Sequence, residues 1–102
     1  MQLISKLCDM IEDELDDAEK YARCALKHKE THPTLATVFN RLSIEELGHM
    51  NSLHEQVVSL INEYKKEHGD PPERMQGVYD YLHQKFMDRA NEVKILQGLF
   101  KG

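Results

Sequence analysis

Apolar residues recur at intervals of three and four along three long segments of the chain, residues 3–29, 34–68 and 72–99. This spacing is that of an α-helix with one buried face, and no segment alternates apolar and polar residues as a half-buried strand would. The prolines stand in the two breaks between the segments, at Pro33 and at the pair Pro71-Pro72. The pattern therefore predicts an all-α protein in which the first two helices form a long antiparallel hairpin and a third helix follows.

The second break carries several residues that end or begin helices. Gly69 suits the left-handed position after a helix, Asp70 can cap the next helix, and Pro71 fits its first turn, with Glu73 completing a capping box. No repeat, low-complexity tract or flexible linker interrupts the chain elsewhere. We therefore expect residues 1–102 to form one helical domain.

Three polar residues interrupt the apolar stripes of the first two segments. Glu14 stands where the first stripe needs a member between Ile11 and Ala18, and Glu46 and His49 stand at two such positions in the second segment. We expect all three side chains to point inward, where a carboxylate without a nearby cation is costly. The stripes consist of Ile4, Leu7, Ile11, Ala18, Tyr21 and Ala25 in the first segment, and of Leu35, Phe39, Leu42, Leu53, Val57, Leu60 and Tyr64 in the second.

The three polar residues are also level with one another in the predicted hairpin. If the two helices fold back about residues 30–33, Glu14 lies as far before the turn as Glu46 and His49 lie after it. Glu46 and His49 are three residues apart and so share one helix face. Two carboxylates and an imidazole at one height are a set of ligands typical of iron or manganese sites in helical bundles.

These residues resemble the first helix pair of rubrerythrin, in the ferritin-like superfamily. The resemblance covers about the first 65 residues and rests on Glu14, a tyrosine seven residues later at Tyr21, and the Glu-x-x-His of Glu46 and His49. It implies that Glu14 binds metal, that Glu46 binds or bridges metal, and that His49 is a terminal nitrogen ligand. Tyr21 would lie beside the site without being a ligand.

The sequence departs from that family because it has neither a second Glu-x-x-His nor a Cys-x-x-Cys. The third segment has no carboxylate at the centre of its apolar face, and Glu92 is at most an additional ligand at the edge. We therefore expect a homodimer, or a higher oligomer of dimers, that completes a ferritin-like four-helix bundle. Two copies of the ligand set would surround two iron ions, with manganese or zinc as alternatives, as in short encapsulated ferritin-like proteins, which this arrangement resembles.

Two functions are compatible with this pattern. One is a di-iron carboxylate protein that oxidises and sequesters Fe(II) or reduces peroxide or oxygen, which makes it an oxidoreductase. The other is a non-enzymatic helical module that self-associates or docks a partner, in which the polar cluster is hydrogen-bonded and only fixes the register of the helices.

Composition and charge exclude several other classes. The formal net charge is -5, and the longest basic cluster is Lys65-Lys66, so no basic stripe exists for nucleic acid or an anionic membrane surface. No apolar run reaches the roughly 18 residues of a membrane span, and the acidic start is unlike a signal peptide, so we expect a cytoplasmic protein. Cys8 and Cys24 are too far apart within one helix to pair and are expected to be reduced.

Other polar groups are weaker candidates. Cys24, His28 and His32 have a four-residue spacing that allows a second, soft metal site. His54 and His83 lie off the apolar stripes, as does His68, and we expect them to be solvated. The acidic run that surrounds Glu14 is expected to form a solvated helix face; its members are Glu12, Asp13, Asp16, Asp17 and Glu19.

Overall fold

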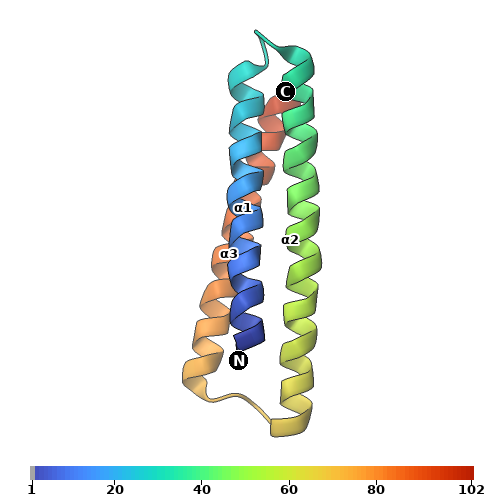
Figure 1. The fold of residues 1–102 in the computed structure, drawn as a ribbon. Helices are drawn as coiled ribbons and strands as arrows, with labels where there is room; N and C mark the ends of the chain where they lie inside the picture. Colours follow the sequence, from blue (N-terminus) through green and yellow to red (C-terminus); the bar gives the residue numbers. More distant parts are fainter. Residues whose placement is uncertain (1) are drawn as a thin grey trace.

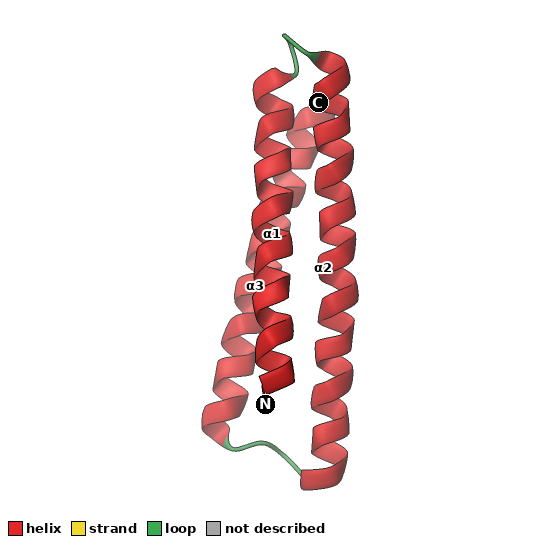
Figure 2. Cartoon of the chain, in the orientation of Figure 1, coloured by secondary structure: helices red, strands yellow, loops and turns green. Residues whose placement is uncertain are grey.

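Three helices make up the chain in the computed structural model, which describes residues 2–102 (Figures 1 and 2). They are α1 (Gln2–His28), α2 (Pro33–His68) and α3 (Glu73–Lys101). The prediction of an all-helical protein is confirmed, and each predicted boundary lies within two residues of the observed one. None of the helices in residues 2–102 combines the length and the apolar character that crossing a bilayer requires.

The helices are arranged as a rod of 55 × 17 × 17 Å. α1 and α2 run antiparallel through the short turn after α1, and α3 runs back beside them in the direction of α1 (Figure 1). α3 packs mainly against α1 and much less against α2. The hairpin therefore has one side covered by α3 and one side that α3 does not cover.

The buried residues of α1 differ from the predicted stripe. At every second position of the stripe, the residue that is buried is the next one along the chain. Glu14 is half-buried at the edge of this face, whereas the adjacent Leu15 is fully buried. The cause is α3: because α1 packs against two helices, its buried face is turned toward the space between them. Leu7 and Tyr21, which were predicted to belong to the buried stripe, are therefore only half-buried, whereas Glu14 turns its buried Oε2 inward from the edge of the face. The buried residues of α1 are Ile4, Cys8, Ile11, Leu15, Ala18, Ala22 and Ala25.

Hydrogen bonds and ion pairs hold α3 on its side of the hairpin. The hydroxyl of the fully buried Ser43 donates to the carbonyl of Ala18 at 2.7 Å and accepts a hydrogen bond from the amide of Gln97 at 2.9 Å. Two basic residues of α3 pair with α1, Lys85 with Glu12 at 3.0 Å and Arg89 with Asp16 at 2.8 Å. Arg89 also lies 3.7 Å from Glu19, so the acidic run on α1 is only partly solvated, because three of its members pair with α3.

The connection between α2 and α3 differs in part from the prediction. Gly69 has a φ of 77°, the positive value for which glycine was expected there, and its N–H donates to the carbonyl of Lys65 at 2.8 Å. Pro72, with φ of -53° and ψ of 146°, directly precedes α3, and no side chain caps the helix. The prediction that Asp70 caps α3 is wrong, because the extended chain at Pro72 separates Asp70 from the first turn.

Candidate metal centre

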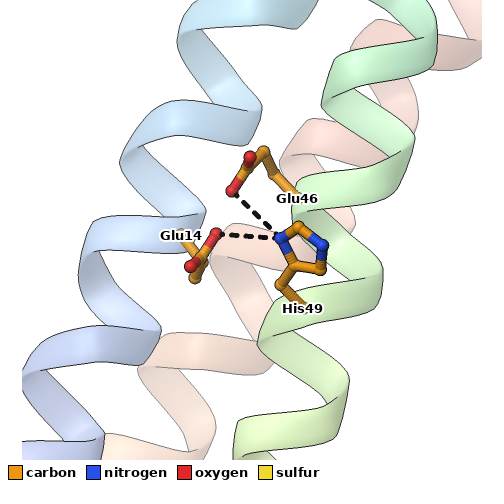
Figure 3. A group of neighbouring side chains, drawn as sticks. All are labelled: Glu14, Glu46 and His49. Carbon is orange, nitrogen blue, oxygen red and sulfur yellow. Dashed lines mark ion pairs between the residues drawn. The ribbon is translucent and has the colours of Figure 1, made fainter.

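Glu14, Glu46 and His49 meet near mid-height of the α1–α2 hairpin (Figure 3). One ligand atom from each side chain can be chosen such that all three atoms lie within 4.8 Å of one another. His49 Nδ1 is 3.6 Å from Glu14 Oε2 and 3.6 Å from Glu46 Oε2. The predicted convergence of these three side chains is confirmed, and their role as metal ligands stays a prediction.

Neighbouring apolar residues fix the direction of each ligand. Leu15 is buried beside Glu14, and Leu47 and Met50 are buried beside Glu46 and His49. Since adjacent residues on a helix are turned by about 100°, burying these neighbours turns the polar side chains to the flank of the core. The three side chains of the cluster therefore stand on rigid helix interiors and not on loops.

The distances suit a bound ion better than a hydrogen-bonded cluster. A separation of 3.6 Å exceeds the 2.7–3.2 Å of a protein N–H···O hydrogen bond. Ligand bonds of about 2.0–2.2 Å place two neighbouring ligands of one ion about 3–3.6 Å apart. Glu14 Oε2 is buried and has no hydrogen-bond partner within residues 2–102. Two carboxylate oxygens and an imidazole nitrogen thus face one point at separations longer than a hydrogen bond, which is an arrangement that a cation satisfies.

The site opens away from α3. The side chain of Glu46 is 19% exposed, but that of His49 is 61% exposed, so the prediction that His49 points inward is wrong. The physical reason is that α3 passes behind the three side chains and none of the helices in residues 2–102 covers their front (Figure 3). The flank of the hairpin that carries the cluster is called the open face, and by helical spacing it comprises Leu3, Leu7, Met10, Glu14 and Tyr21 of α1 with Leu35, Phe39, Leu42, Glu46, His49 and Leu53 of α2.

Tyr21 belongs to the open face as a packing residue. It is half-buried two helical turns after Glu14, and its ring stacks on Phe39 with a centroid distance of 6.2 Å and an interplanar angle of 22°. This position matches the expectation that Tyr21 is a neighbour of the cluster. The aromatic pair places apolar surface on the open face, two helical turns from Glu14.

The remaining sequence candidates do not join this cluster. Glu92 is exposed on α3, on the other side of α1. Within the described residues, Cys24, His28 and His32 do not form a ligand group, and the rings of His28 and His32 lie 5.9 Å apart in an edge-on arrangement. Cys8 and Cys24 are free thiols, and burial raises the pKa of the Cys8 thiol, with Asp9 adding to this effect.

One contact between α2 and α3 was not predicted from the sequence. His54 is half-buried rather than solvated, and its Nε2 lies 2.9 Å from His83 Nδ1, which joins α2 to α3. Burial lowers the pKa of His54, and the neighbouring His83 lowers it further, while Glu55 acts in the opposite direction. The sequence could have indicated this contact, because His54 and His83 are nearly equidistant from the break at residues 69–72. Glu14 and His49 are related to the first turn in the same way.

The chain was compared with models of protein families, with curated proteins and with solved structures. None of the three comparisons finds a match. The geometry of the cluster and of the open face is therefore the basis for a functional proposal.

Proposed function

We propose that this protein is a ferritin-like di-iron carboxylate protein that oxidises and sequesters Fe(II) or reduces peroxide or oxygen. The observation that carries the proposal is the unpartnered, buried Glu14 Oε2 facing Glu46 Oε2 and His49 Nδ1. A buried carboxylate oxygen without a donor is unfavourable unless a cation compensates it. Glu14, Glu46 and His49 are the residues that would hold this cation.

The donor set fits iron. When iron is bound, it supplies one-electron redox chemistry toward oxygen or peroxide. Glu14 and Glu46 bring two negative charges to the site, which favours the more highly charged ferric form over the ferrous form. The exposed His49 places a nitrogen ligand at the entrance, so an ion can reach the carboxylates from the open face without unfolding the hairpin.

A second copy of the chain would complete the site. Three ligand residues are fewer than a two-metal centre in a helical bundle uses, and α3 contributes none to the cluster. The open face also carries apolar side chains that remain exposed, among them Leu3, Met10 and Leu35. A two-fold pairing of open faces buries this apolar surface and brings a second set of Glu14, Glu46 and His49 to the first.

The proposal can be tested by titrating the protein with metal while the molecular mass of the assembly is measured in parallel. Under anaerobic conditions we expect Fe(II) to bind at two ions per two chains and to strengthen dimerisation in sedimentation equilibrium. Aerobic Fe(II) addition should then raise the near-ultraviolet absorbance. Glu46→Ala and His49→Ala should abolish binding and oxidation, whereas His68→Ala, at an exposed histidine near the end of α2, should change neither.

Two results would contradict the proposal. A monomer that binds a full pair of metal ions would exclude a shared site. Dimerisation through the open face without any uptake of metal would identify the chain as a helical self-association module, in which the polar cluster only sets the register.

A further inference from the structure

A pair of histidines joins the two helices that touch each other least. His54 lies on α2 and His83 on α3, and the contact between α2 and α3 is the smallest of the three contacts between helices. The His54 Nε2 and His83 Nδ1 atoms are 2.9 Å apart, and the ring centroids are 5.0 Å apart. One nitrogen of each ring therefore lies on the edge that faces the other ring.

The facing nitrogens can offer two lone pairs to one ion. A neutral imidazole carries a single proton, which can reside on either ring nitrogen. In the hydrogen-bonded form, one facing nitrogen carries its proton and donates it to the other. If that proton moves to the remote nitrogen of the same ring, an ion can take its place between the rings without a change in the charge of either ring. Burial lowers the pKa of His54, which favours the neutral form that metals bind.

The separation of the two nitrogens matches one class of metal ion. Two nitrogens that lie about 2.0–2.1 Å from an ion, at right angles to each other, are about 2.9 Å apart. A tetrahedral angle at the ion would need a separation of about 3.3–3.4 Å. Neighbouring ligands at right angles are typical of Cu(II) and Ni(II), both of which bind imidazole well.

The surroundings leave the remaining coordination positions to water. His54 is half-buried and His83 is exposed, so an ion can reach the pair from solvent and the His83 ring can turn toward it. Both histidines border a small cavity that Cys8 also lines. Within residues 2–102, however, Cys8 does not form a three-ligand group with the two histidines. A site with two protein ligands and water is open and exchangeable, unlike a closed structural site.

We propose that His54 and His83 form a second metal site, which binds one Cu(II) or Ni(II) ion per chain and clamps α3 to α2. This site is separate from the cluster of Glu14, Glu46 and His49, because one of its ligands lies on α3, which contributes no residue to that cluster. The two sites also differ in their donors. Two neutral nitrogens suit a late divalent ion, whereas two carboxylates on the open face favour iron.

Titration with Ni(II) tests the clamp, since Ni(II) is not reduced by the free thiols of the chain. Every protein in the test carries His49→Ala, so that the cluster on the open face lacks its nitrogen ligand. We expect calorimetry to show one Ni(II) per chain, and the urea midpoint to be higher in excess Ni(II) than in chelator. His54→Gln and His83→Gln should each weaken Ni(II) binding about tenfold or more and remove this rise. The urea midpoints in chelator check that the variants fold.

The matched control is His28→Gln, because His28 and His32 are a second pair of neighbouring histidine rings. This variant should leave the Ni(II) affinity and the rise of the midpoint unchanged. The absence of Ni(II) binding, or binding that survives His54→Gln or His83→Gln, would overturn the proposal. Tighter binding of Zn(II) than of Ni(II) would overturn it as well, since Zn(II) prefers the tetrahedral angle. None of these results depends on Fe(II) uptake, so the two proposals fail separately.

Discussion

The two sides of the α1–α2 hairpin differ in how the acidic residues of α1 are paired. On the side covered by α3, the buried Ser43 both donates and accepts a hydrogen bond, and Glu12 and Asp16 of α1 have basic partners on α3. On the open face, Glu14 comes from the same helix, yet its buried Oε2 has no partner among the described residues. Asn40 Oδ1 on α2 is also buried without a partner among these residues, but Glu14 Oε2 is a carboxylate oxygen that lies beside Glu46 and His49, and this cluster on the open face is where a cation would be compensating.

The difference is also one of packing. The largest side chains on the covered side are buried in one cluster that joins all three helices, whereas the apolar residues of the open face are partly or largely exposed. Substitutions on the covered side should therefore change the free energy of unfolding with or without metal. Substitutions at the cluster on the open face should act chiefly when metal is present.

Truncation of a core side chain on the covered side should have the largest effect on the free energy of unfolding. Phe86 is 3% exposed against α1, and Phe86→Ala should lower the free energy of unfolding by about 3–5 kcal/mol, because the change removes buried surface and leaves a cavity. Leu35→Ala, at an exposed apolar residue of the open face, should cost about 0.5 kcal/mol or less. Urea unfolding in chelator measures both. Equal losses would show that the two sides are packed alike.

Metal should stabilise the protein through the open face. With Fe(II) at a hundredfold excess over its Kd, under anaerobic conditions, the wild type should gain about 2.7 kcal/mol relative to chelator. Glu46→Leu should gain nothing. In chelator this variant should be as stable as the wild type or more stable, because an uncompensated carboxylate is replaced by an apolar group. A metal-dependent shift in Glu46→Leu would exclude Glu46 as a ligand.

Loss of the buried hydroxyl on the covered side should have an intermediate effect. Ser43→Ala removes the hydrogen bond to Ala18 and leaves the amide of Gln97 without its acceptor, which should cost about 1–3 kcal/mol. Thermal unfolding should show this loss equally with chelator and with Fe(II). Reduced Fe(II) stoichiometry in this variant would mean that the two sides are coupled rather than separate.

The smallest effect should be a pH dependence at the contact between α2 and α3. Burial and His83 hold the pKa of His54 below its usual 6.5, so the unfolded chain binds a proton more readily than the folded chain. This contribution to stability is present above pH 6.5 and is lost as the pH falls toward the lower pKa of the folded state. His54→Gln should flatten the dependence of the urea midpoint on pH in this range. His68→Gln, at an exposed histidine, should leave the wild-type slope unchanged.

The helices and the convergence of Glu14, Glu46 and His49 were predictable because both follow from local patterns. Periodicity locates the helices, and residues equidistant from a tight turn must lie side by side in an antiparallel hairpin. The exposure of His49 was not predictable in the same way. It depends on which side of the hairpin α3 covers, and the shift from Glu14 to Leu15 at the centre of the buried face has the same non-local cause.

The cluster sits close to the midpoint of both helices that carry it, since Glu14 is near the middle of Gln2–His28 and His49 is near the middle of Pro33–His68. A two-fold axis through a point at the middle of a rod superposes the two rods along their whole length. An axis displaced by one helical turn, about 5.4 Å, would offset the two copies by twice that distance and leave about 10.8 Å of each rod unmatched at one end. In the proposed dimer, the central position of the cluster would combine the greatest possible overlap between two copies with the greatest distance of bound ions from the fraying helix ends.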